Sequence, residues 1–252
     1  MGTRRSQGSR RVSALGAALV GLSLLAFVSM KASPVVADWL DHGRGGADDE
    51  WRDGSGADQD VPPPDPALAQ SDGTSWIVAS GFTEPVGAGT LYRYRVEVEG
   101  ATGLDAAAVA EVVGYALGHP QGWTNEGFAF QRVGPDDGDP VDMVVRVATP
   151  GTVDQLCAPL QTNGETSCRN GVNVVLNQLR WQAGVDAYAG DIERYRIVLV
   201  NHEVGHLIGH AEHPTCPGPG RLAPVMMQLY YTGLQGCVAN IWPYAEDGSF
   251  IG

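Results

Sequence analysis

The order of apolar and polar positions predicts a domain that mixes strands and helices. Apolar and charged residues alternate through Tyr92–Glu99, which predicts a strand with one buried face. A helix is expected next, because Asp105 can cap its first turn, apolar residues recur at helical spacing through 109–117, and Gly118 can end it. Further strands are predicted at Phe128–Val133, Val141–Val147 and Val172–Asn177. The order of these elements indicates a single α+β domain with one core over residues 74–252.

A second helix is predicted from Asp191 onward. The stretch Asp191–Asn201 contains no proline and no internal glycine. Four apolar residues have the spacing of one helix face: Ile197, Val200, Val204 and Leu207. The residues that follow Asn201 include polar positions off this stripe. We therefore expect the helix to pack on the core through one face and to turn the other toward a cleft.

The end of this predicted helix carries the chemistry. Four of the six histidines lie within residues 202–213, and His202–His206 reads His-Glu-Val-Gly-His, the HExxH pattern of zinc hydrolases. Histidines four apart lie on one helix face about 6 Å apart along the axis, so both reach one ion at roughly 2.0–2.1 Å. Glu203 then lies beside the ion and can act as general base toward a zinc-activated water. A chance occurrence is the alternative, and the helical context argues against it.

A third protein ligand is expected, because catalytic zinc takes three and leaves one position for water. His210 would lie about 12 Å from His202 along a continued helix, too far to share the ion. Gly209 can instead adopt the left-handed conformation that ends a helix and turns the chain back. From the spacing alone, Glu212 and His213 are both candidates.

These residues resemble the metzincin metallopeptidases, whose pattern is HExxHxxGxx followed by His or Asp, with a methionine-containing turn downstream. The segment Ala223–Gln228, Ala-Pro-Val-Met-Met-Gln, is similar to that Met-turn. The resemblance implies a zincin-type α+β fold, with a mixed sheet, an HExxH helix and an apolar base beneath the metal. Met226 or Met227 would supply that base. Two methionines filling a gap in the core are the structural alternative.

The chain resembles still more closely the small bacterial snapalysin type and an uncharacterised family of secreted actinobacterial proteins. Five segments carry the second likeness: Asn201–His206, Cys216–Gly220, Pro224–Gln228, Gly236–Cys237 and Trp242–Tyr244. The likeness covers the chain from about residue 75 and supplies no activity of its own. Counting forward through the metzincin pattern makes Glu212 the third ligand, whereas counting back from Cys216 in the actinobacterial family gives His213. We predict His213, because imidazole is the commoner ligand, with Glu212 as the alternative.

The N-terminal segments predict export. Arg4, Arg5, Arg10 and Arg11 precede an uncharged apolar run over residues 12–30, and Val35–Ala37 offers a signal-peptidase site. Residues 1–37 are therefore predicted to be a signal peptide, with an uncleaved membrane anchor through residues 12–30 as the alternative. Residues 38–73 are rich in acidic residues, proline and glycine, and are expected to form a disordered linker.

Cysteine usage and charge narrow the function further. Four cysteines in an exported chain indicate two disulfides, and of three possible pairings we favour Cys157–Cys168 and Cys216–Cys237 over a cysteine zinc site, which would show CxxC spacing. The net charge of −13, with Lys31 as the single lysine, argues against a nucleic-acid partner. No glycine-rich phosphate loop of the required spacing precedes a helix.

Together these observations predict an exported, monomeric zinc endopeptidase acting on a peptide or protein substrate. His202, His206 and His213 would hold one Zn²⁺, and Glu203 would activate its water. The sequence does not identify the oxyanion partner: Tyr230 and Tyr231, after the Met-turn, are candidates, with core packing as the alternative. By resemblance to metzincins, the substrate would extend along an edge strand, for which Gly171–Asn177 is the candidate. A non-catalytic zinc protein of the cell envelope and a hydrolase of non-peptide amides are the alternatives.

Overall fold

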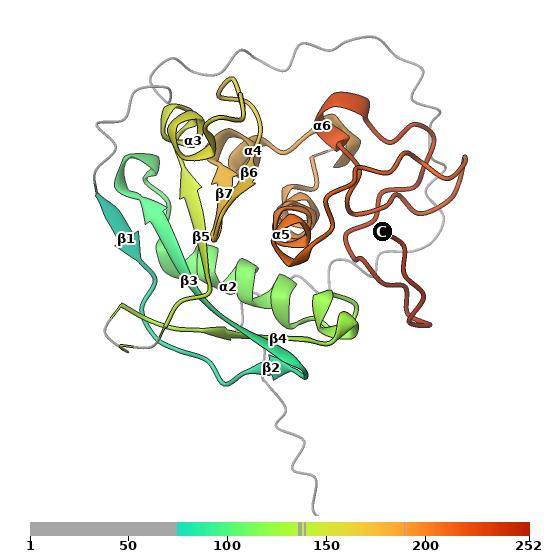
Figure 1. Cartoon of the computed structure of the whole chain (residues 1–252). Coiled ribbons are helices and arrows are strands. Elements are labelled where there is room, and N and C mark those ends of the chain that lie inside the picture. The colour runs from blue at the N-terminus through green and yellow to red at the C-terminus, as the bar shows by residue number, and fades with distance from the viewer. Residues whose placement is uncertain (1–74, 136–137, 139, 189) are drawn as a thin grey trace, which may run out of the picture. The chain divides into compact units, whose positions relative to one another are not determined.

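A computed structural model describes residues 75–252, apart from 136, 137, 139 and 189 (Figure 1). The predicted signal peptide or anchor at 1–37 and the predicted linker at 38–73 lie outside the described residues. Within the described part of the chain, no helix is long and apolar enough to cross a membrane.

A seven-stranded mixed sheet forms one side of the domain, which confirms the α+β prediction. Its strands run in the order β2-β4-β3-β5-β7-β6, with β1 paired to β3 (Figure 1). The neighbours β4, β3, β5 and β7 are parallel, whereas β1, β2 and β6 pair antiparallel with their neighbours. The strands are β1 Trp76–Val78, β2 Val86–Gly87, β3 Thr90–Glu99, β4 Phe128–Arg132, β5 Met143–Ala148, β6 Cys168–Asn170 and β7 Asn173–Asn177.

Helices α3 and α5 both contact the strands β6 and β7 at one end of the sheet. The helices are α2 Ala106–Gly118, α3 Pro150–Cys157, α4 Gln178–Ala183, α5 Ile192–Ile208 and α6 Leu229–Thr232. Short 3-10 turns lie at Gly100–Thr102, Trp123–Glu126 and Asp186–Tyr188. The predicted first helix is confirmed as α2, where the Asp105 side chain accepts a hydrogen bond from the Ala107 N–H at 2.9 Å. α5 contacts α2, α4, β6 and β7, so it lies between the helical layer and the edge of the sheet.

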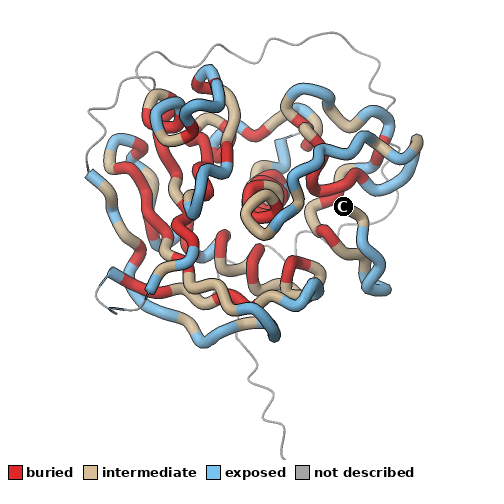
Figure 2. Tube along the Cα trace, viewed as in Figure 1, coloured by how far each residue is buried: buried red, intermediate tan, exposed pale blue. Residues whose placement is uncertain are grey.

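The environment of α5 differs from the amphipathic arrangement expected. Nearly every residue from Tyr195 to Gly205 is buried, so the helix runs through the interior and does not rest on the core with one face (Figure 2). The side with His202, Glu203 and His206 lines a cavity, as expected, while the C-terminal segment covers another side of the helix. The physical reason is that polar residues such as Asn201 find partners inside the fold: its amide donates to the Ile241 carbonyl at 2.9 Å.

Two glutamates in β3 also depart from the predicted exposed face. Glu97 and Glu99 are only 4% and 1% exposed. The Glu97 carboxylate pairs with the Arg95 and Arg146 guanidinium groups, both at 2.8 Å. The Glu99 carboxylate accepts hydrogen bonds from the backbone and side chain of Thr149, at the start of α3. Alternation of residue types cannot reveal these distant partners. Arg146 lies 49 residues from Glu97 in the sequence, and Thr149 lies 50 residues from Glu99.

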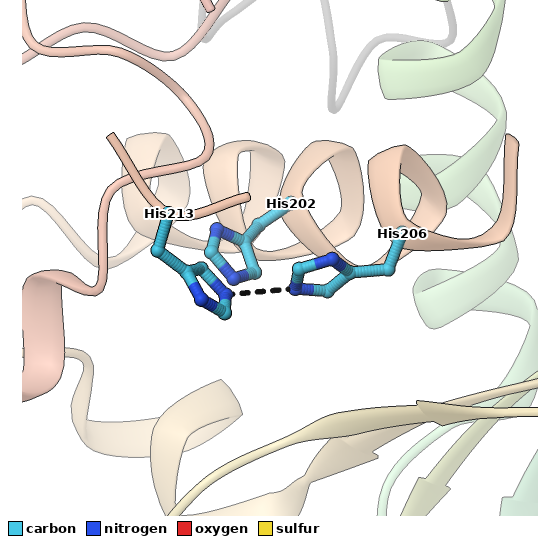
Figure 3. Close-up of side chains that lie close together, drawn as sticks. All are labelled: His202, His206 and His213. Atoms are coloured by element: carbon cyan, nitrogen blue, oxygen red, sulfur yellow. Dashed lines mark hydrogen bonds between the residues drawn. The ribbon is translucent and has the colours of Figure 1, made fainter. Parts of the chain in front are cut away.

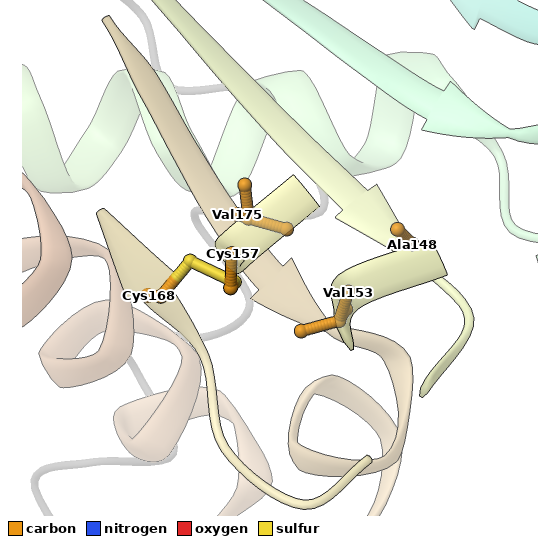
Figure 4. Close-up of a cluster of buried hydrophobic side chains, with 5 residues drawn as sticks. All are labelled: Ala148, Val153, Cys157, Cys168 and Val175. Atoms are coloured by element: carbon orange, nitrogen blue, oxygen red, sulfur yellow. A yellow bond between two sulfur atoms is a disulfide. The ribbon is translucent and has the colours of Figure 1, made fainter. Parts of the chain in front are cut away.

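Both predicted disulfides are present. Cys157–Cys168 joins the end of α3 to β6 and belongs to a buried cluster with Ala148, Val153 and Val175 (Figure 4). Cys216–Cys237 closes the loop that contains the paired methionines. Disulfides persist in oxidising compartments, so both bridges indicate an exported protein.

The expectation that Gly171–Asn177 forms the edge of the sheet is wrong. β7 pairs with β5 on one side and with β6 on the other, so it is an internal strand. The edge is the three-residue strand β6, Cys168–Asn170, which runs antiparallel to β7. A strand this short has no recognisable alternation, which is why the sequence did not reveal it.

Candidate metal centre

Three predicted ligands lie together at the C-terminal half of α5. His202 and His206 project from the helix and His213 from the segment after it, and one nitrogen of each lies within 4.8 Å of the others (Figure 3). The Nε2 atoms of His206 and His213 are 3.0 Å apart. The side-chain amide of Gln228 also lies 3.0 Å from His213 Nε2. Glu212, the alternative ligand, is exposed and does not belong to this cluster.

The chain reaches this arrangement because α5 ends at Gly209. This residue has a φ of 121°, and its backbone N–H donates to the Gly205 carbonyl. The His210 N–H donates to the same carbonyl at 2.9 Å. A residue with a Cβ adopts such a φ only with strain, so glycine suits this position. The reversal after Gly209 brings His213 back toward the helix, as the sequence analysis expected.

Backbone carbonyls fix the two imidazoles of α5. His202 Nδ1 lies 2.9 Å from the Val225 carbonyl, and His206 Nδ1 lies 2.8 Å from the His210 carbonyl. A carbonyl only accepts, so each Nδ1 carries the proton and each Nε2 keeps a free lone pair. Burial lowers the pKa of His202 to about 3 and also lowers the pKa of His206, which keeps both rings neutral. Neutral, oriented imidazoles are the form that binds a metal ion.

Glu203 lies beside the histidines, and none of the ion pairs among the described residues includes it. Its side chain is 5% exposed, and its Oε2 has no hydrogen-bond partner among the described residues. Burial raises the pKa of this carboxyl to about 8. Leaving a buried oxygen without a donor costs free energy, so this oxygen, next to three imidazoles, makes Glu203 a candidate functional residue.

The two methionines lie close under this site. Both are buried, at 2% exposure for Met226 and 1% for Met227. Met226 packs against the backbone of α5 at Gly205, whereas Met227 lines the same cavity as the histidines. Val225, directly before them, provides the carbonyl that orients His202.

A cavity of about 330 Å³ opens beside the histidines. The three histidines and Glu203 line it, together with Arg180 and Tyr195. Tyr230 and Tyr231, the expected oxyanion partners, also line it. The Tyr230 hydroxyl donates to Glu165 at 2.7 Å, and Tyr231 is 60% exposed.

His210 has a supporting position that sequence spacing did not reveal. Its imidazole stacks on Trp123 with ring centroids 4.7 Å apart and lies 2.9 Å from Glu126. Its carbonyl orients His206. The backbone contacts made by Val225 and His210 carry no signal in the sequence, because any residue type has a carbonyl.

A comparison with protein families identifies the family of this chain. Residues 62–241 match a family described as protein of unknown function (DUF3152). The chain belongs to this family. The DUF3152 match includes the three histidines, Glu203, both methionines and all four cysteines, and ends just before Trp242. No curated protein and no solved structure matches the chain.

Proposed function

We propose that this DUF3152 protein is an exported zinc-dependent metallo-endopeptidase. One observation carries the proposal: three imidazoles converge beside Glu203, a buried carboxyl whose Oε2 has no hydrogen-bond partner among the described residues. Tetrahedral ligation at about 2.0–2.1 Å places two nitrogens roughly 3.3 Å apart. The 3.0 Å between the Nε2 atoms of His206 and His213 lies close to that separation. His202, His206 and His213 would hold the ion.

The arrangement around the histidines supports a metzincin-like enzyme. α5 contains the HExxH residues and ends at Gly209, and the chain turns back to supply His213. Met226 and Met227 follow the carbonyl that orients His202 and provide the apolar base expected of a Met-turn. We therefore assign His213, and not Glu212, as the third ligand of the proposed centre.

The chain's own residues provide the proton transfers. A zinc ion, when bound, lowers the pKa of water and polarises the scissile carbonyl. The Glu203 carboxylate, once ionised, would accept a proton from the attacking water, whose oxygen forms a bond to the carbonyl carbon. The same carboxyl then gives the proton to the amide nitrogen as the C–N bond breaks. Because Glu203 is buried, this exchange takes place away from bulk solvent. Electrostatic interactions are stronger in the protein interior than in water.

The retained carboxylate favours an enzyme over a zinc protein without catalysis. A purely structural site has four protein ligands and needs no base. In the described part of the chain, the cluster offers three histidines and no fourth ligand atom from cysteine, aspartate or glutamate. Three ligands leave one position open, which is the arrangement of catalytic zinc.

The test is cleavage of a mixed peptide library by the full-length, oxidised chain loaded with Zn²⁺. The matched control is Glu203→Gln, which keeps the size of the side chain and removes the base. The proposal is supported if the wild type cleaves peptides and the Glu203→Gln control, with its full zinc content, cleaves them at least about 100-fold more slowly. Full zinc occupancy with no cleavage by either form contradicts it and favours a non-catalytic zinc protein.

A further inference from the structure

A buried arginine lines the cavity beside the proposed metal centre. Arg180 lies in α4 and is 5% exposed. It lines the cavity together with Glu203 and the three histidines. Arginine stays charged in proteins and is rarely buried without a counter-ion. Its position therefore calls for a physical explanation.

The guanidinium has few partners within the protein. Its NH1 group donates to the Gly184 carbonyl at 3.2 Å, while its Nε is buried and has no acceptor among the described residues. None of the ion pairs that the described residues form includes Arg180. A buried charge without a counter-charge is costly. An anionic ligand would remove that cost.

Neighbouring groups hold the guanidinium in place before any ligand arrives. The Tyr230 ring lies 4.8 Å from the guanidinium carbon, a cation–π distance. The Tyr230 hydroxyl donates in turn to Glu165 at 2.7 Å. The Gly184 carbonyl fixes the guanidinium from within its own helix end. An oriented guanidinium loses less freedom when it pairs with a carboxylate than a mobile side chain would.

The charges that line the cavity contrast with the rest of the chain. The chain has a net charge of −13, yet its cavity is lined by Arg169 and Arg180 and by a single acidic residue, Glu203. Arg180 belongs to α4, whereas the histidines belong to α5 and the segment after it, and all of them line one cavity. A ligand group bound by Arg180 would thus share the cavity with the reacting bond.

We propose that this cavity binds a carboxylate of the substrate and that Arg180 is the specificity-determining residue. The carboxylate is either the side chain of an aspartate or glutamate near the scissile bond, or the α-carboxylate at the end of a peptide. The assignment of this group to a substrate rests on the proposed function, whereas the recognition of a carboxylate by Arg180 does not. The first source makes the protein an endopeptidase that selects acidic residues, and the second makes it cut near a C-terminus.

Binding to the metal-free, full-length chain tests the proposal separately from catalysis. Chelation of metal removes the competing attraction between zinc and carboxylates. One pair of ligands is N-acetyl-glutamate methylamide and N-acetyl-glutamine methylamide, which differ only at the side chain. A second pair is N-acetyl-alanine and N-acetyl-alanine amide, which differ only at the α-carboxylate. Affinity is measured by calorimetry or by NMR titration.

In at least one pair, the carboxylate should bind about tenfold more tightly than its amide, as expected for a hydrogen bond to a charged group. The pair that shows the preference identifies the source. Arg180→Gln should abolish the preference, whereas Arg221→Gln, at an exposed position outside the cavity, should retain it. Equal affinities for acid and amide in both pairs would overturn the proposal, and this comparison needs no substitution. Acid preference with no peptide cleavage would retain Arg180 as a binding residue and reject only the peptidase.

Discussion

Gly205 and Met226 are in direct contact: a Cβ placed on Gly205 would lie 2.5 Å from Met226 Sδ and 2.8 Å from the Trp123 ring. The close approach lets the segment that orients His202 pack onto α5. It also explains why the residue before the second histidine of the motif is glycine. The first histidine is held by the carbonyl of Val225, next to Met226, so this contact positions the metal centre.

We therefore expect Gly205→Ala to destabilise the protein by about 1–3 kcal/mol, because the methyl group overpacks the core. The Met226 thioether can shift, but Trp123 is 0% exposed and its ring is rigid. Urea unfolding, followed by circular dichroism, measures the change. Gly114→Ala in α2 is the matched control, since its Cβ would meet no atom nearer than 3.5 Å. Alanine is a better helix former, so the control should be unchanged or slightly more stable. Equal effects at both positions would contradict the packing explanation.

Zinc content distinguishes the two candidate third ligands. His213→Ala should reduce bound zinc from about one ion per chain to a small fraction, because it removes one of three ligands. Glu212→Ala should retain the ion, since Glu212 lies outside the cluster. Elemental analysis after dialysis measures the content. Loss of zinc from the Glu212 variant alone would reverse the assignment. Zinc should also raise the thermal midpoint of the wild type, because it binds the folded state.

The Cys216–Cys237 bridge should matter more for zinc than the Cys157–Cys168 bridge. It follows His213 by three residues and encloses Val225, whose carbonyl orients His202. Replacing both of its cysteines with serine should weaken zinc binding by about tenfold or more. This is the usual effect of losing a contact that orients a metal ligand. Competition with a chelating dye measures the affinity. Each bridge should stabilise the fold by about 3 kcal/mol, because loop-closure entropy changes little between sequence separations of 11 and 21. Equal losses of zinc affinity in both double variants would argue against the selective role.

His119 should make stability depend on pH. Its ring stacks on Trp242 with centroids 3.8 Å apart, and its Nδ1 accepts a hydrogen bond from the Gln121 N–H. Burial lowers the pKa of His119 to about 4 from 6.5. The unfolded chain therefore binds a proton before the folded chain does, so stability is full above pH 6.5 and falls as the pH drops toward 4. The ring is half-buried, so solvent reduces the effect.

The measurement is urea unfolding of the metal-free protein at pH 7.5 and pH 5. His119→Gln should lose less stability than the wild type over this interval, because the amide does not titrate. A loss of the same size in both proteins would assign the pH dependence to other groups.

Local periodicity was enough to predict α2, the HExxH helix and the longer strands. It also placed His202, Glu203 and His206 on one helix. The likeness to the actinobacterial family favoured His213 as the third ligand, whereas the metzincin pattern favoured Glu212. What the sequence did not reveal depends on distant partners. The burial of Glu99 requires Thr149, and the edge strand β6 exists only through its pairing with β7. Arg180 gave no signal either, because an arginine in a six-residue helix is indistinguishable from a surface residue until the cavity forms around it.

The bridge between Cys157 and Cys168 has a consequence for how a ligand is received. β6 has a neighbour on one side only, yet its first residue is covalently joined to α3 and packs with Val153 and Val175. Cys168 also lines the cavity. This wall is therefore ordered when the chain folds and oxidises, and a ligand need not supply the free energy to order it. In a reducing environment the same wall would regain its freedom, and the oxidation state of the compartment would thus set the affinity of the cavity.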